Sequence, residues 1–173
     1  MKNIRSDTNI GLHNTEREGA MLKEKNIYKE GLPVKVITAN IMEYPIHFHD
    51  DIEVVYVLEG SVGLKNGYYS YVLNQGDIFI LNDREIHSFN HTDQPNMVMM
   101  LQMDLAFFSK YYGNLKNSFF VTDMKDEDDE SLEALRNILG RIMLDILDKG
   151  YGYEYKVIEG THNLIANLLA NFQ

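Results

Sequence analysis

Short runs of β-branched, aromatic and methionine residues follow one another from Pro33 to Met103, and this pattern limits the possible folds most strongly. The runs are separated by polar or glycine-bearing turns, and they read VKVITANI, IEVVYVL, YYSYVL, DIFIL, HSFNH and MVMMLQM. Regularly spaced short strands of this kind are typical of a β-sandwich or a β-barrel. After Gln102 the apolar residues recur with the period of a helix. The sequence therefore predicts a mainly β domain that is followed by helices.

Asn66 and Gly67 mark a hairpin turn inside the β region. An Asn-Gly pair supplies the two positive φ angles of a type I′ turn, which here would place Leu64 opposite Tyr69. Because residues two apart share a face of a strand, this register predicts one buried face formed by Val62, Leu64, Tyr69 and Tyr71.

Two amphipathic segments follow, with a shorter helix predicted before them over 104–113 and an acidic loop over 125–130. Segment 131–150 has Ser131 as a candidate N-cap and Gly150 as a candidate stop. Its apolar residues recur at helical spacing, and they are Leu132, Leu135, Leu139, Ile142, Met143 and Ile146. A last helix is predicted over 159–173.

The apolar stripes of these helices leave two interpretations open. They either pack back on the barrel or form the interface of a symmetric dimer, the most common oligomer. For the dimer, the candidate contact residues are Leu135, Leu139, Ile142 and Ile146.

The chain divides into three predicted parts. Residues 1–30 have mixed charge and weak periodicity, with at most a short helix within 14–25, and we expect them to form an N-terminal arm. Residues 31–104 are expected to form the barrel, and residues 105–173 the C-terminal helices with the dimerisation region.

Composition excludes several classes of function. The 16 Lys and Arg residues stand against 26 Asp and Glu residues, so the net charge of -10 disfavours direct binding to DNA. The chain lacks cysteine, which excludes disulfides and thiolate chemistry and fits a reducing compartment. Neither a signal sequence nor a membrane span is visible. We therefore expect a soluble, cytoplasmic protein.

The stretch HFHDDIEVVYVLEG carries the most distinctive chemistry of the sequence. His47, His49 and Glu53 fall on one face of an extended chain, and they share it with Val55 and Val57. Imidazole and carboxylate groups are ligands for divalent transition metals.

His87, in GDIFILNDREIHSFN, is the candidate for the fourth ligand. His91 lies in a polar turn and is expected to be solvated. The four residues either bind a divalent ion, for which Zn, Ni, Mn and Fe are the candidates, or hydrogen-bond one another or an effector directly. A pH-sensitive pocket is a third possibility.

Two motifs resemble those of cupins. His47, His49, Glu53 and Gly60 have the spacing of the first cupin motif, and Gly76 and His87 lie as in the second. The chain departs from the second motif at three positions: Asn82 stands where cupins usually have proline, Arg84 where they have glycine, and Asn90 one place before the usual asparagine.

The stretch from His47 to Phe89, with MLQMDLAFFSKYY after it, resembles the N-terminal sensor domain of AraC-type bacterial transcription regulators. The resemblance covers residues 33–113. It implies a cupin jelly-roll barrel with two or three C-terminal helices, which binds a small polar effector such as a sugar and forms a homodimer. It also implies that DNA is bound only by a C-terminal helix-turn-helix domain, which this chain does not contain. Candidate effector contacts are Phe89, Gln102 and Tyr69.

Two other functions remain possible from the sequence. One is a small metal-dependent cupin enzyme, such as a dioxygenase or an isomerase, and the other is a free-standing carbohydrate-binding cupin. No second constellation of catalytic residues is visible, so we name no catalytic residue and expect a non-enzymatic domain.

Overall fold

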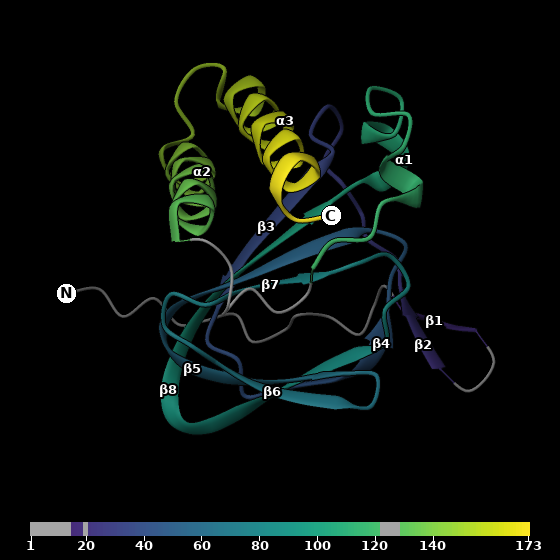
Figure 1. Ribbon diagram of the computed structural model, residues 1–173, viewed down its shortest axis with the longest axis vertical. Helices are drawn as coiled ribbons and strands as arrows, with labels where there is room; N and C mark the ends of the chain where they lie inside the picture. The colour runs from purple at the N-terminus through teal and green to yellow at the C-terminus, as the bar shows by residue number, and fades with distance from the viewer. Residues whose placement is uncertain (1–14, 19–20, 122–128) are drawn as a thin grey trace.

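The structure is a computed structural model that describes residues 15–18, 21–121 and 129–173 (Figure 1). One eight-stranded sheet has the order β1-β2-β4-β8-β5-β6, with β3 paired to β8 and β7 paired to β5. The strands are β1 (Thr15–Glu18), β2 (Met21–Glu24), β3 (Val34–Ala39), β4 (Glu43–Phe48), β5 (Ile52–Asn66), β6 (Tyr69–Asn74), β7 (Ile78–Leu81) and β8 (His87–Met103).

The two long strands β5 and β8 pair along most of their length and organise the sheet. The predicted runs HSFNH and MVMMLQM are both parts of β8. Irregular register near Val57 and Gly60 interrupts the ladder between β5 and β8, and such irregularities bend a strand. The long strands can therefore curl around an interior.

Alternate residues of β5 serve two separate cores. Val55 and Val57 belong to an inner cluster with Phe89 and Met100, whereas Ile52 belongs to an outer cluster with residues of α2 and α3. The predicted alternation along this strand is confirmed. The residues that share a face with Glu53 point into the barrel.

The chain after β8 is helical, as predicted. It contains α1 (Leu105–Phe108), a 3-10 helix (Leu115–Asn117), α2 (Asp129–Asp148) and α3 (Tyr153–Asn171). Helices α2 and α3 pack against each other on one side of the sheet (Figure 1). The prediction of Ser131 as an N-cap is wrong, because α2 already begins at Asp129. Residues 125–128 of the predicted acidic loop lie outside the described residues.

Most of the residues predicted as dimer contacts are buried within the single chain. Leu135, Leu139 and Ile142 are fully buried in the outer cluster, and Ile146 packs against it. These side chains cover the barrel, as in the alternative interpretation, and are not available to a second copy. A dimer interface on α2 would need other residues of that helix.

The N-terminal segment differs from the prediction of a short helix. Strands β1 and β2 form an antiparallel pair, and β2 also pairs in parallel with β4, through Leu22 with His47 and Lys23 with Phe48. Pairing with the edge of the sheet therefore overrides the weak local preference for a helix.

The register of the predicted hairpin is shifted by two residues. Asn66 pairs with Tyr69, and Leu64 pairs with Tyr71. The turn is formed by Gly67 and Tyr68, of which only Gly67 has a positive φ (57°), a pattern that suits a type II′ turn with glycine first. The shift keeps the faces but moves Tyr69 to the hairpin end, where it is 71% exposed.

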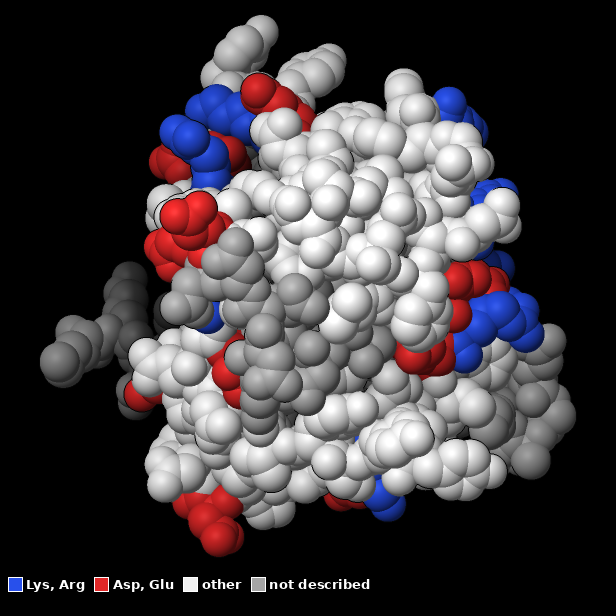
Figure 2. Space-filling model, viewed as in Figure 1, with Lys and Arg blue, Asp and Glu red and all other residues white. Residues whose placement is uncertain are grey.

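Charged side chains gather mainly at the edges of the face shown in Figure 2, and a broad uncharged area lies over α3. Within the described part of the chain, no helix has the length and the apolar character to cross a membrane.

Candidate metal and effector site

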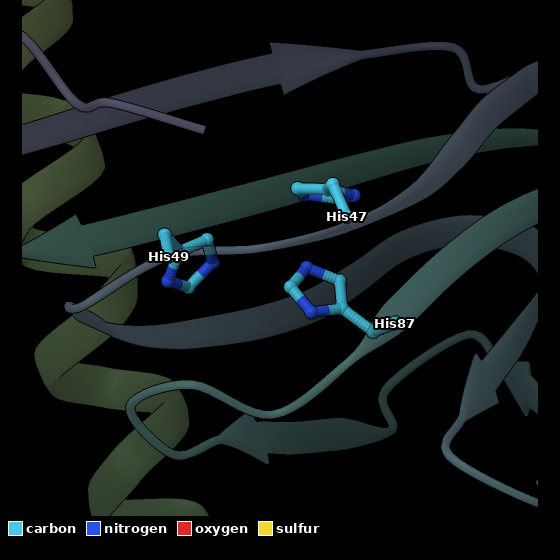
Figure 3. Close-up of side chains that lie close together, drawn as sticks. All are labelled: His47, His49 and His87. Atoms are coloured by element: carbon cyan, nitrogen blue, oxygen red, sulfur yellow. The ribbon is translucent and has the colours of Figure 1, made fainter. Parts of the chain in front are cut away.

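Three histidines from two separate stretches of the chain meet inside the barrel (Figure 3). His47 lies in β4, His49 directly after it, and His87 at the start of β8. Each is at most 2% exposed. Their candidate ligand atoms all lie within 4.8 Å of one another, so one ion could contact all three.

The three imidazole rings are oriented by main-chain carbonyl groups. The Nδ1 atom of His47 lies 2.9 Å from Pro45 O, that of His49 3.0 Å from Asp51 O, and that of His87 2.9 Å from Glu85 O. A carbonyl oxygen only accepts, so each Nδ1 carries the proton and donates it. The other nitrogen of each ring, Nε2, is therefore the atom turned towards the cluster, and such carbonyl contacts are typical of metal-binding histidines.

Glu53 faces the Nε2 atom of His49 at 3.0 Å, and it also accepts a hydrogen bond of 2.8 Å from Gln102. Burial alone would raise the pKa of Glu53, but the hydrogen bond and the charge of His49 lower it below its ordinary value. In turn, burial would lower the pKa of His49, and Glu53 raises it. Two acceptors cannot share a hydrogen bond, so the contact needs either a second proton on His49 or a cation.

Glu24 is a second carboxylate of the site, and it was not predicted from the sequence. Its Oε2 atom lies 3.3 Å from His47 Nε2 and accepts a hydrogen bond of 3.0 Å from the Tyr44 hydroxyl. The pairing of β2 with β4 brings Glu24 to this place. No local motif around residue 24 signals such a role.

Several buried polar atoms of the site have no hydrogen-bond partner among the described residues. They are His87 Nε2, Glu53 Oε1 and Gln102 Oε1. Burial, and then the charge of His47, lower the pKa of His87 to about 3, so its ring is neutral and can act as a ligand. Buried polar atoms without partners destabilise the folded protein unless a ligand binds to them. The donor set fits a divalent transition metal, with Nε2 atoms and carboxylate oxygens as ligands.

A cavity of about 440 Å³ opens beside the histidines, a size that suits a small molecule. Of the four predicted metal ligands, His47 and Glu53 line it. Among the predicted effector contacts, Phe89 and Gln102 also line it, whereas Tyr69 does not. The other lining residues are Leu22, Glu24, Ile37, Asn40, Ile41, Met42, Glu43, Tyr44, Pro45 and Met100.

His91 is exposed, as predicted, and its Nδ1 atom contacts Met42 O at 3.1 Å. It takes no part in the histidine cluster.

A barrel that holds buried histidines beside a small-molecule cavity defines a ligand-binding cupin-like domain. The family model of the AraC-like ligand binding domain matches residues 37–170. The chain therefore belongs to this family. The prediction of a mainly β cupin barrel that is followed by helices is confirmed. No curated protein matches the chain.

Several solved structures resemble parts of the chain. An RmlC-like cupin from Shewanella frigidimarina NCIMB 400 shares 19% identity over 42% of this chain and 67% of its own, with a TM-score of 0.39. The DMSP lyase DddQ from Ruegeria pomeroyi DSS-3 shares 24% identity over 40% of this chain and 36% of its own, with a TM-score of 0.36. An oxalate decarboxylase from Bacillus subtilis shares 15% identity over 42% of this chain and 22% of its own, with a TM-score of 0.38.

Proposed function

We propose that this chain is the effector-binding and dimerisation domain of an AraC-type transcription regulator and that it is not an enzyme. The observation that carries the proposal is the cavity of about 440 Å³ with His47 of the buried histidine cluster in its wall, in a chain of the AraC-like ligand-binding family. Sensing requires a site that binds a small molecule, and this cavity supplies one.

The proposed effector is a small polar molecule with an apolar surface, such as a sugar. Apolar side chains, among them Phe89 and Met100, form much of the cavity wall. The unpartnered Oε1 atoms of Glu53 and Gln102 are acceptors, so they favour an effector with hydroxyl or amine donors. None of the described lining residues is a lysine or an arginine, which disfavours an anionic effector when no metal ion is bound.

The proposed ion is Zn, Ni, Mn or Fe, held by His47, His49, His87 and Glu53. When bound, it would supply a positive charge and open coordination positions for an oxygen of the effector. The chain's own groups orient this site, because the main-chain carbonyls fix the rings.

For dimerisation, we propose an exposed apolar surface at the junction of α2 and α3, in place of the buried residues. Leu144 is 64% exposed and Leu147 is 69% exposed, and residues three apart in a helix are neighbours on its surface. Tyr151 and Tyr155, also exposed, follow in the connection and in α3.

A DNA-binding domain that follows α3 would receive the signal, and DNA would be contacted only there. The excess of acidic residues in this chain agrees with the proposal that DNA is bound by another domain. The gene sequence beyond codon 173 tests the proposed DNA-binding domain. We expect helix-turn-helix motifs in frame, and a stop codon directly after codon 173 would overturn the regulator.

Native mass spectrometry tests the sensing cavity. Protein purified without added ligand should retain an extra small-molecule mass, and Met100→Trp should abolish it, because Met100 lines the cavity. The matched control is Met97→Trp on the same strand, since Met97 is 37% exposed and outside the cavity lining. Equal retention by both variants would contradict the proposed site.

A further inference from the structure

We propose that Glu24 is a fifth ion-binding group, so that a divalent ion in the histidine site links the N-terminal strand β2 to the barrel. This inference rests on the ion of the proposed function. It adds a residue from outside both cupin-like motifs, and it gives the N-terminal segment a direct contact with the site.

The backbone pairing brings Glu24 to the histidines. Strand β2 runs parallel to β4, with Leu22 opposite His47 and Lys23 opposite Phe48. Alternate residues of a strand point to opposite sides, so Leu22 and Glu24 share a face. Both line the cavity, whereas Lys23 forms an ion pair with Asp50.

The contact of Glu24 with His47 has the same form as the contact of Glu53 with His49. In each pair a carboxylate oxygen faces the Nε2 atom, at 3.3 Å from His47 and at 3.0 Å from His49. Both carboxylates are buried, with exposures of 8% and 1%. In both rings Nε2 is the nitrogen that the carbonyl contact at Nδ1 leaves free.

His87 lies between the two pairs. Its ring centroid is 4.1 Å from that of His47 and 5.0 Å from that of His49, while the latter two are 6.0 Å apart. Its Nε2 atom is buried and has no hydrogen-bond partner in the part of the chain that the structure describes. An ion bound to this nitrogen would therefore lie close to both histidine–carboxylate pairs.

The charges of the site agree with a cation there. Two buried carboxylates carry two negative charges, and the only nearby lysine among the described contacts is Lys35, whose Nζ lies 3.5 Å from Glu24 Oε1. Lys35 and the ion would thus bind different oxygens, because Oε2 is the oxygen that faces His47. A divalent ion with neutral histidines would offset the remaining charge.

Ion binding by purified, metal-stripped protein tests the inference, with Zn²⁺ titrated by calorimetry against a competing chelator. We expect Glu24→Gln, which keeps the shape and removes the charge, to weaken Zn²⁺ binding by about tenfold or more. The matched control is Glu43→Gln, because Glu43 lines the same cavity but is exposed at its rim. Affinity for Zn²⁺ that is equal in the wild type and in Glu24→Gln would overturn the role of Glu24.

Amide hydrogen exchange gives a second readout that needs no variant. In the wild type, Zn²⁺ should slow exchange in residues 21–26, and unchanged exchange in the loaded protein would contradict the link. If the wild type takes up no Zn²⁺, Ni²⁺, Mn²⁺ or Fe²⁺, the ion and this inference both fail. The effector cavity is judged separately by its retained small molecule.

Discussion

At the scale of single residues, the histidine site was largely visible in the sequence. The alternation of His47, His49 and Glu53 along an extended chain predicts their common direction. The structure places the two histidines in one buried cluster with His87, and Glu53 lies against His49. Glu24 could not be predicted, because a strand pairing from a distant segment brings it there. Tyr69 could not be placed because Asn-Gly sequences allow more than one turn register.

Arg84 explains one departure from the cupin pattern. It has a φ of 62°, so the backbone keeps the left-handed conformation that a glycine at this position would adopt readily. Its guanidinium lies 5.5 Å from the Phe48 ring centroid, and its main-chain N–H donates to His49 O at 2.7 Å. These contacts help to offset the strain of a positive φ.

Gly60 supports a prediction on stability. It has a φ of 70°, and a Cβ atom there would lie 1.6 Å from the main-chain oxygen of Pro95. We expect Gly60→Ala to lower the free energy of unfolding by more than about 3 kcal/mol, measured by urea denaturation. Gly67→Ala is the control, because Gly67 shares the positive φ but has open space around it, so about 1 kcal/mol is expected. Equal losses in the two variants would refute the steric explanation.

At the scale of elements, the apolar stripe of α2 was predictable but its partner was not. Helical spacing identifies Leu135, Leu139 and Ile142 as one face, and periodicity alone does not say whether a barrel or a second copy covers it. In the structure, the barrel and α3 cover this face.

Substitution of two leucines of α2, one on its buried face and one on its exposed face, tests which face of the helix packs. Leu139→Ala should lower the free energy of unfolding by about 2–5 kcal/mol, because Leu139 is fully buried. Leu144→Ala should change it by less than about 0.5 kcal/mol under conditions in which the protein is monomeric, since Leu144 is 64% exposed. Thermal and urea denaturation measure both. Similar losses would mean that α2 packs with another face.

Asn82 holds Phe120, which follows α1 in the chain, against the barrel. Its side-chain amide donates to Phe120 O at 3.1 Å and its oxygen accepts from Phe120 N at 2.9 Å. Proline, which cupins usually have at this position, could make neither contact. The departure from the motif thus has a structural role in this chain.

Replacing Asn82 should therefore loosen the packing of the C-terminal region. We expect Asn82→Ala to cost about 2 kcal/mol or more of the free energy of unfolding, because two buried main-chain groups lose their partners. Asn137→Ala is the matched control, since Asn137 is exposed on α2. Urea denaturation that finds both variants equally stable would show that the Phe120 contacts do not contribute.

At the scale of the whole molecule, the order of a β region followed by helices was predictable from the change of period after Gln102. The inclusion of β1 and β2 in the sheet was not, because their pairing depends on the edge that β4 offers. The family match over residues 37–170 agrees with the resemblance that the motifs suggested.

The proposed dimer predicts a change in the mass of the whole molecule. Sedimentation should find a dimer, and the pair Leu144→Glu with Leu147→Glu should shift it towards monomer, because two buried charges would oppose the interface. Because Leu144 and Leu147 are exposed, we expect the doubly substituted variant to stay folded, and circular dichroism checks this. A dimer of unchanged strength would exclude this surface as the interface.

The central claim is that the histidine cluster beside the effector cavity holds a divalent ion, and elemental analysis combined with metal titration tests it most directly. The wild type and His91→Ala, which changes an exposed histidine, should each bind about one ion of Zn, Ni, Mn or Fe per chain. The double variant His47→Ala with His49→Ala should bind none while its barrel stays folded. A wild type without any ion, or a double variant with the same ion content, would contradict this account.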